Sequence, residues 1–139
     1  MIKVIYWSGT GNTKNMAEYI GQGIKEKGKE VDVLEISNAT ENDIVSAEIL
    51  ALGCPAMGCE ELEDSEVIPF IEANEALMKD KKVVLFGSYG WGNGEWMETW
   101  KEQMESLGAK LVTDPLIVNA LTQGQDEEIC IGYGRQIVG

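Results

Sequence analysis

Apolar residues along the chain recur in five short runs, and the segments between these runs carry apolar residues at helical spacing. The first run, residues 2–7, is rich in β-branched and aromatic residues. Such a run is typical of a strand buried on both faces of a parallel sheet. After it, Met16, Ile20 and Ile24 follow the spacing of an amphipathic helix, and Gly28 ends the pattern.

The other four apolar runs predict four more strands, each separated from the next by a helical pattern. They are residues 31–36, 49–53, 83–86 and 111–118, the last interrupted at Asp114-Pro115. The helical patterns are a short turn at 44–47 capped by Asn42 or Asp43, a helix from about Ser65, an amphipathic helix marked by Trp96, Trp100, Met104 and Leu107, and a helix near 126–138 weakened by Gly132 and Gly134. This alternation predicts one α/β domain over residues 1–139, a doubly wound parallel sheet with right-handed crossovers.

The loop that joins the first strand to the first helix carries glycines and small polar side chains. It consists of Ser8, Gly9, Thr10, Gly11, Asn12 and Thr13. The glycines let the backbone approach a ligand or take positive φ, and the helix that follows presents its N–H groups at the same point. The loop therefore suits an oxyanion, although a tight strand-to-helix turn with hydroxyl caps has the same composition.

Two common phosphate motifs do not match this loop. A nucleoside triphosphate loop needs a Lys-Ser/Thr pair after its second glycine, and here Thr13-Lys14 stand in the opposite order. A dinucleotide fingerprint needs a third glycine at the position of Lys14. One terminal phosphate fits the loop better than a pyrophosphate.

Two further unusual loops follow the third and fourth predicted strands, at 54–64 and 87–94. In doubly wound sheets ligands bind beyond the carboxyl ends of the strands, so the three loops should converge on one crevice. Trp91, framed by four glycines, suits stacking on a flat ligand, and the Met57 thioether could cover the other face of the ring. FMN meets this description.

An acidic run covers the end of the second loop and the start of the predicted helix that follows it. It comprises Glu60, Glu61, Glu63, Asp64 and Glu66. Such a run is expected to be a solvated face, and beside an aromatic ligand it would disfavour any added negative charge.

Composition narrows the possible partners. The net charge is −13, from 24 acidic and 11 basic residues, and there is no histidine. We expect no nucleic acid and no membrane as partners, since both favour basic proteins, whereas a basic protein surface would be attracted. No apolar run approaches the roughly 20 residues of a membrane span, and the first residues do not form a signal peptide, so we expect the protein in the cytoplasm.

The cysteines do not indicate a metal or redox motif. Cys54, Cys59 and Cys130 match no metal spacing, and without histidine a zinc or iron–sulfur site is not expected. Catalysis by a Cys-His or Ser-His pair is excluded. We expect buried or loop thiols in a reducing compartment.

Three segments resemble the short-chain, clostridial type of flavodoxin. They are Y-W-S-G-T-G-N-T at 6–13, L-G-C-P-A-M-G at 52–58 and L-F-G-S-Y-G-W-G at 85–92, and the resemblance covers nearly the whole chain. It implies a flavodoxin-like three-layer sandwich whose five-stranded parallel sheet has the order 2-1-3-4-5. It also implies an electron carrier, not an enzyme, which holds FMN non-covalently and cycles at low potential, mainly between semiquinone and hydroquinone.

The resemblance further implies which residues contact FMN. Residues 8–13 would bind the phosphate, Met57 and Trp91 would flank the isoalloxazine, and Glu60 would meet its N3. The full implied set is Ser8, Gly9, Thr10, Gly11, Asn12, Thr13, Cys54, Pro55, Ala56, Met57, Gly58, Cys59, Glu60, Ser88, Tyr89, Gly90, Trp91, Gly92 and Asn119. The implied partners are redox proteins with basic docking surfaces, of the reductase or ferredoxin-dependent type, and the implied oligomeric state is a monomer.

Gly58 would lie beside flavin N5. In the turn at 57–60, a type II′ conformation needs positive φ at Gly58, which costs little, whereas type II needs it at Cys59. We therefore expect reduction to turn the Gly58 carbonyl toward a protonated N5. Cys59 departs from the acidic or amide residue that the family pattern leads us to expect there.

Other protein classes share parts of this pattern but need particular residues of their own. A receiver domain would need an acidic pocket after strand one and an Asp after strand three, where this chain has Ser8-Gly9 and Cys54-Pro55. A low-molecular-weight phosphatase would need a Cys-x5-Arg loop, which is absent. An NAD(P)H:quinone reductase is usually longer, and an FMN module that serves one enzyme, such as an activator of ribonucleotide reductase, stays open.

Overall fold

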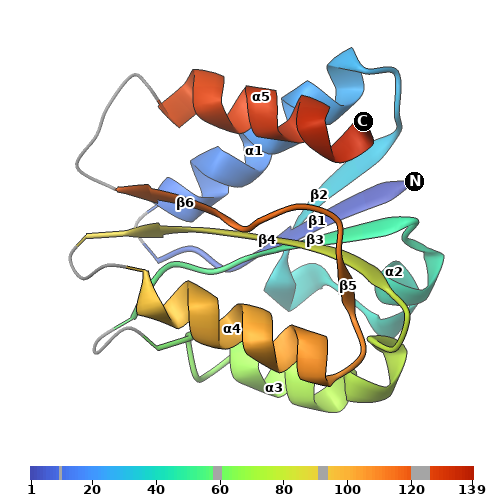
Figure 1. Ribbon diagram of the computed structural model, residues 1–139, viewed down its shortest axis with the longest axis vertical. Coiled ribbons are helices and arrows are strands. Elements are labelled where there is room, and N and C mark those ends of the chain that lie inside the picture. Colours follow the sequence, from blue (N-terminus) through green and yellow to red (C-terminus); the bar gives the residue numbers. More distant parts are fainter. Residues whose placement is uncertain (10, 58–60, 91–93, 120–125) are drawn as a thin grey trace.

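A parallel β-sheet forms the centre of the protein in a computed structural model, which describes residues 1–9, 11–57, 61–90, 94–119 and 126–139. The strands are β1 (Ile2–Tyr6), β2 (Val31–Glu35), β3 (Ile49–Gly53), β4 (Lys82–Tyr89), β5 (Lys110–Leu111) and β6 (Leu116–Asn119). The order is β2-β1-β3-β4-β5, with β6 also paired to β4, and every pairing between these strands is parallel (Figure 1). The predicted order 2-1-3-4-5 is confirmed.

Helices cover both faces of the sheet. They are α1 (Asn12–Glu26), α2 (Glu41–Ser46), α3 (Val67–Ala73), α4 (Glu95–Ser106) and α5 (Asp126–Val138), with short 3-10 turns at Ile36–Asn38 and Glu75–Leu77. Helices α1 and α5 lie on one face, and α3 and α4 lie on the other (Figure 1). The three-layer sandwich is thus confirmed. No helix in the described part of the chain is both long enough and apolar enough to cross a membrane.

The alternation of side chains along β1 explains why its sequence is almost entirely apolar. Ile2, Val4 and Tyr6 pack into the core beneath α1 and α5, whereas Ile5 packs into the core beneath α3 and α4. Successive side chains of a strand point to opposite faces, so a strand covered on both sides needs apolar residues at nearly every position.

The last predicted strand is split, as the sequence suggested. Segments β5 and β6 pair with different parts of β4, and Asp114-Pro115 lies between them. Tyr133 of α5 donates a hydrogen bond from its hydroxyl to the Asp114 carbonyl at 2.6 Å. Burial raises the pKa of this phenol well above its usual range, with the Asp114 charge acting in the same direction. This hydrogen bond therefore holds the segment between β5 and β6 against α5.

The predicted cap of α2 is wrong by a few residues. Thr40, not Asn42 or Asp43, takes the N-cap position, and the Asp43 side chain reaches back to accept the Thr40 N–H at 2.8 Å. This reciprocal arrangement is a capping box with Asp at the third helical position.

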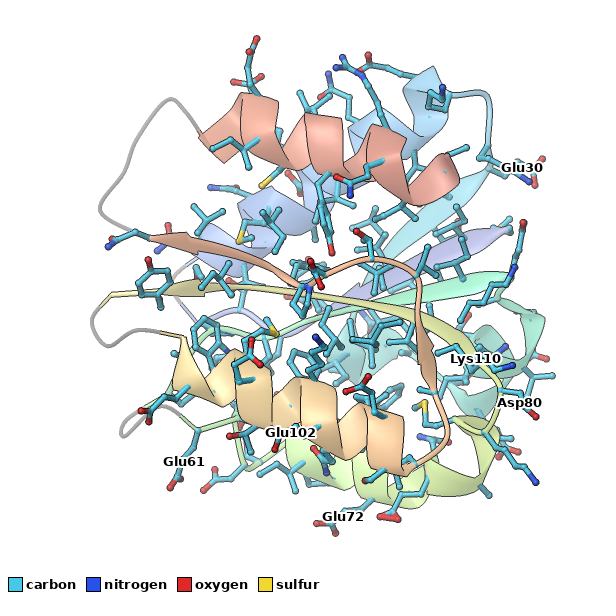
Figure 2. The ribbon with its side chains drawn as sticks, in the orientation of Figure 1. Glu30, Glu61, Glu72, Asp80, Glu102 and Lys110 are labelled. Carbon is cyan, nitrogen blue, oxygen red and sulfur yellow. The ribbon has the colours of Figure 1, made fainter. Side chains whose placement is uncertain are left out.

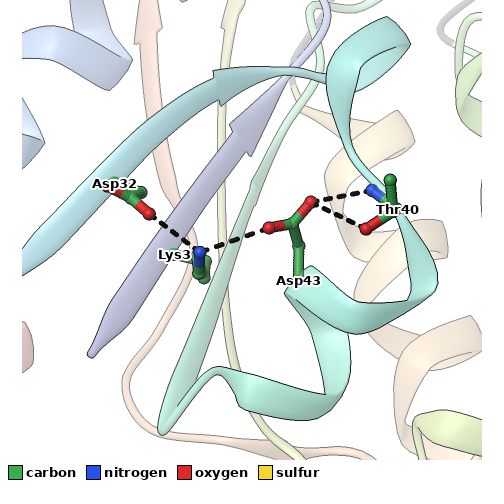
Figure 3. A network of polar contacts seen from close by, with 4 residues as sticks. All are labelled: Lys3, Asp32, Thr40 and Asp43. Carbon is green, nitrogen blue, oxygen red and sulfur yellow. Dashed lines mark hydrogen bonds and ion pairs between the residues drawn. The ribbon is translucent and has the colours of Figure 1, made fainter.

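The same carboxylate joins α2 to the sheet. Lys3 of β1 lies between Asp32 of β2 and Asp43, with its Nζ 2.8 Å from Asp32 Oδ2 and 3.2 Å from Asp43 Oδ1 (Figure 3). The hydrogen bond to Asp32 is the largest effect that raises the pKa of Lys3, against the opposing effect of burial. The buried ammonium of Lys3 therefore has two carboxylate partners. Such pairing offsets the cost of burying a charge.

Candidate functional site

A pocket of about 260 Å³ opens at the carboxyl ends of β1, β3 and β4. The described residues that line it are Trp7, Gly9, Asn12, Pro55, Ala56, Met57, Ser88, Tyr89 and Gly90. They come from all three loops that the sequence analysis singled out, so the predicted convergence of these loops is confirmed. Parallel strands place their carboxyl ends at one edge, which is where ligands bind in doubly wound sheets.

The first loop leads directly into α1. Gly11 takes the N-cap position with φ of 97°, a left-handed conformation that favours glycine, and its N–H donates to Ser8 Oγ at 3.0 Å. No side chain in the described residues caps α1. An anion placed here would accept the hydrogen bonds that a cap side chain usually accepts, and the helix dipole would favour its charge.

The second loop continues the pairing of the sheet beyond β3. Cys54 N–H donates to the Phe86 carbonyl at 3.1 Å, and Ala56 N–H donates to the Ser88 carbonyl at 2.9 Å. Met57 and Glu61 then exchange two backbone hydrogen bonds of 2.9 Å. Met57 is thus held by backbone pairing at the wall of the pocket.

The third loop begins where β4 approaches β3 too closely for a side chain. A Cβ at Gly87 would lie 2.1 Å from the Cys54 carbonyl oxygen. The same carbonyl accepts the indole N–H of Trp96 at 3.3 Å, and the Tyr89 ring lies 5.9 Å from the Trp96 ring. Glycine at this position lets two backbones meet, which fixes the start of the loop.

Cys54 is buried under the pocket. Burial raises the pKa of its thiol to about 12, and its Sγ accepts the Glu63 N–H at 3.5 Å. A thiol that stays protonated is a poor nucleophile and metal ligand, so Cys54 is a packing residue of the second loop. Among the described residues, no group of three or more His, Cys, Asp or Glu side chains could hold a metal ion.

The structure places the predicted site residues in three groups. Those that line the pocket are Gly9, Asn12, Pro55, Ala56, Met57, Ser88, Tyr89 and Gly90. Ser8, Gly11, Thr13 and Cys54 lie in the same loops without lining it, and Asn119, which pairs in register with Tyr89, also does not line it. Thr10, Gly58, Cys59, Glu60, Trp91 and Gly92 lie outside the described residues.

Sequence reasoning missed Trp7 as a residue of the site. Its indole lines the pocket, and its Nε1 donates to Glu66 Oε1 at 3.3 Å. The signal was present, because Trp7 is an aromatic residue at the carboxyl end of the first strand, directly before the loop. It was instead attributed to the strand core.

The acidic run of the second loop is not uniformly solvated. Glu61, Asp64 and Glu66 are exposed, and Glu61 projects outward on the side of the molecule where the loops lie (Figure 2). Glu63, in contrast, is only 4% exposed. The expectation of a solvated face is therefore wrong for Glu63.

A second, wider hollow of about 480 Å³ lies at the other edge of the sheet. Glu48 and Lys82, which stand at the amino ends of β3 and β4, belong to its lining, together with Lys79 and Lys81. In Figure 2 the neighbouring Asp80 and Lys110 mark this far edge. It shares no described residue with the three loops.

The residues of the first pocket fit a mononucleotide. A helix N-terminus stands beside the first loop for a phosphate, and Pro55, Ala56 and Met57 offer an apolar wall to a planar ring. Fold and pocket together define a doubly wound α/β protein with a pocket of suitable shape and lining for a mononucleotide at the carboxyl edge of its sheet.

Comparison with known proteins gives the family. A family model described as flavodoxin matches residues 4–132. A flavodoxin from Clostridium beijerinckii is 47% identical over 136 residues, covering 98% of both chains, and one from Megasphaera elsdenii is 46% identical over 127 residues, covering 91% of this chain and 92% of that one. The solution structure of two-electron reduced Megasphaera elsdenii flavodoxin superimposes with a TM-score of 0.88 at 41% identity, covering 99% of this chain and 98% of that one.

The chain belongs to the flavodoxin family. Flavodoxins bind FMN and transfer electrons; they are carriers rather than enzymes. They pass these electrons to and from redox partners.

Proposed function

We propose that this chain binds FMN in the pocket at the ends of β1, β3 and β4 and carries electrons at low potential between redox proteins. The observation that carries the proposal is the pocket itself, which three separate loops build beside the N-terminus of α1, where no described side chain forms a cap. FMN, when bound, supplies the reversible uptake of one or two electrons.

The chain's own residues would bind and orient the cofactor. Gly9 and the first turn of α1 would hold the phosphate through backbone N–H groups, because no Arg lies in the sequence of this loop, while the bond from the Gly11 N–H to Ser8 Oγ would shape the loop around it. Met57 and Trp7 would exclude water from the ring, and the Ala56–Ser88 backbone pair keeps two of the three loops together. The remaining predicted contacts, Trp91 above all, belong to the same proposal.

The low potential follows from charge. The protein carries a net charge of −13, and the exposed carboxylates of Glu61, Asp64 and Glu66 lie in the second loop or directly after it. Each added electron brings negative charge into this field unless a proton accompanies it. Reduction to an anionic flavin is therefore disfavoured, which lowers the potential of that step.

The same charge suggests how partners bind. A redox protein with a basic surface would be steered to the acidic loop beside the pocket, and the interaction would weaken with salt. The high net charge also favours a monomer through self-repulsion. Neither Cys54 nor Cys130 forms a disulfide among the described residues, which agrees with the reducing conditions of the cytoplasm.

The direct test is a visible absorption spectrum of the purified protein, followed by a stepwise anaerobic reductive titration. We expect flavin absorption bands, either as purified or after addition of FMN, and two resolved one-electron steps of which the second has the lower potential. A protein that binds no added FMN would contradict the proposal. Loss of FMN affinity in Met57→Ala, with an unchanged far-UV spectrum, would tie binding to this pocket.

A further inference from the structure

Glu63 is the buried carboxylate of the described chain. It is 4% exposed, and in the chain it lies between Met57 and the start of α3. The neighbouring acids Glu61, Asp64 and Glu66 are all exposed. A carboxylate is buried only when hydrogen bonds replace its water, so its partners show what it holds in place.

The carboxylate of Glu63 accepts hydrogen bonds from the backbone that leads into α3. Oε1 accepts the Ser65 N–H at 2.6 Å and also the Ser65 hydroxyl. Oε2 accepts the N–H groups of Glu66 at 2.8 Å and Val67 at 3.0 Å. One side chain thus satisfies three backbone donors at a helix start, where a negative charge is favoured.

The backbone of Glu63 is also hydrogen-bonded to the residue that follows β3. Its N–H donates to the buried Sγ of Cys54, the residue directly after β3. Two residues earlier, Glu61 is paired by two backbone hydrogen bonds with Met57. The short segment from Glu61 to Glu63 is therefore held by backbone hydrogen bonds at both of its ends.

Glu63 also connects to a second lining residue of the pocket, Trp7. Glu66, whose N–H it holds, accepts the indole N–H of Trp7 through its own carboxylate. Trp7 and Met57 both line the pocket, and they come from different loops. The partners of Glu63 thus lead to Met57 through Glu61 and to Trp7 through Glu66.

We propose that Glu63 is a positioning residue of the flavin pocket, whose carboxylate fixes the second loop and the start of α3 so that Met57 and Trp7 stand at the distance the cofactor ring needs. The proposal rests on the proposed function, since it assigns the ring to this pocket. Burial acts to raise the pKa of Glu63, but the hydrogen bonds from Ser65, Val67 and Glu66 outweigh it and lower that pKa below its ordinary value. The group therefore acts as a permanent acceptor at neutral pH.

The test compares Glu63→Gln with Asp64→Asn. Both remove one negative charge from adjacent positions, but the Asp64 side chain is exposed whereas the Glu63 carboxylate is buried. FMN affinity is measured by quenching of flavin fluorescence, and the two one-electron potentials by anaerobic titration. We expect Glu63→Gln to weaken FMN binding on the order of tenfold and to shift both potentials, and Asp64→Asn to stay within about twofold in affinity.

A second readout uses the protein without cofactor. Hydrogen exchange of the Met57, Glu61 and Val67 amides should be faster in Glu63→Gln than in the wild type, and unchanged in Asp64→Asn. If Glu63→Gln does not fold, Ser65→Ala decides, because it removes one donor to the carboxylate and should weaken FMN binding in the same direction by a smaller factor.

Two outcomes would overturn the role of Glu63. One is that Glu63→Gln keeps the FMN affinity, the two potentials and the amide exchange of the wild type. The other is that Asp64→Asn has an equal effect, because loss of one negative charge would then explain the result. Failure of the wild-type protein to bind FMN would instead refute the proposed function. Amide exchange of the protein without cofactor would still test whether Glu63 fixes the loop.

Discussion

The hydroxyl oxygens of Thr13 and Ser88 lie 3.1 Å apart, although 75 residues separate them in the chain. Thr13 belongs to the first turn of α1 and is 1% exposed; Ser88 belongs to the end of β4 and is 4% exposed. The bond ties the first loop to the third at the point where both meet the pocket. Two hydroxyls that sequence analysis assigned to the cofactor thus also satisfy each other.

Replacing Ser88 with Ala should destabilise the protein even without FMN. The Thr13 hydroxyl would lose its partner while still buried, at a cost of about 1–3 kcal/mol. Urea unfolding of the apoprotein measures this cost. The double variant Thr13→Val/Ser88→Ala should lose less than the sum of the two single variants, since the second change removes the unpaired group. Strict additivity would contradict the hydrogen bond.

Two glycines of α5 should respond in opposite ways to Ala. A Cβ at Gly134 would lie 2.1 Å from the Ile20 carbonyl oxygen of α1, whereas a Cβ at Gly132 meets nothing within 4 Å. Gly134→Ala should therefore separate the two helices at a cost of about 1–3 kcal/mol or more. Gly132→Ala should stabilise the protein by about 0.5–1 kcal/mol, because Ala favours the helix. Thermal unfolding checks both, and equal effects would refute the close crossing.

Acid should destabilise the protein partly through Asp43. The hydrogen bond from the Thr40 N–H is the largest effect that lowers the pKa of Asp43, and the bond from Lys3 adds to it, against the opposing effect of burial. Between this lowered value and the ordinary one the unfolded chain binds more protons, so stability rises with pH across that window. The contribution is complete above about pH 4 and is lost as the pH falls through the folded-state pKa.

The measurement for Asp43 is urea unfolding at pH 7 and at pH 3. Asp43→Asn should lose stability at pH 7 and show a smaller drop on acidification than the wild type. Asp64→Asn, at an exposed position, serves as the control and should keep the wild-type drop. The same drop in Asp43→Asn and wild type would refute the contribution of this group.

Salt should raise the potential of the second electron. The carboxylates of the second loop and the net charge of −13 oppose an anionic flavin, and added salt screens this repulsion. Potentiometric titration at about 10 mM and about 1 M salt, where the screening length falls from about 30 Å to 3 Å, should show the rise. The control is free FMN titrated at both concentrations, and an equal change there would remove the role of the protein field.

Part of the site could be predicted because it lies within short segments of sequence. The first loop contains its own glycines and helix start, and the order of strand, loop and helix fixes that Gly9, Met57 and Ser88 meet at one edge. The interruption at Asp114-Pro115 was also visible, because proline cannot donate to a strand ladder. The capping box of Thr40 is a local signal as well, because Thr40 and Asp43 stand at the spacing that such a box requires.

Other features depend on contacts between distant segments, so no local sequence pattern predicts them. Glu63 stands in a run of acids that predicts a solvated face, and it is buried only because Cys54 and the start of α3 surround it. Gly134 weakens a helix in isolation, yet it lies where α1 and α5 cross.

The sequence by itself determined the parallel α/β sheet, the order of its elements, the three loops and the family, because side-chain period and loop composition are set by neighbouring residues. Only the tertiary structure decided that Thr13 pairs with Ser88, that Trp7 lines the pocket and that Glu63 is buried. These depend on which atoms the packed layers bring within hydrogen-bond distance, and that distance is fixed by the whole fold rather than by any one segment.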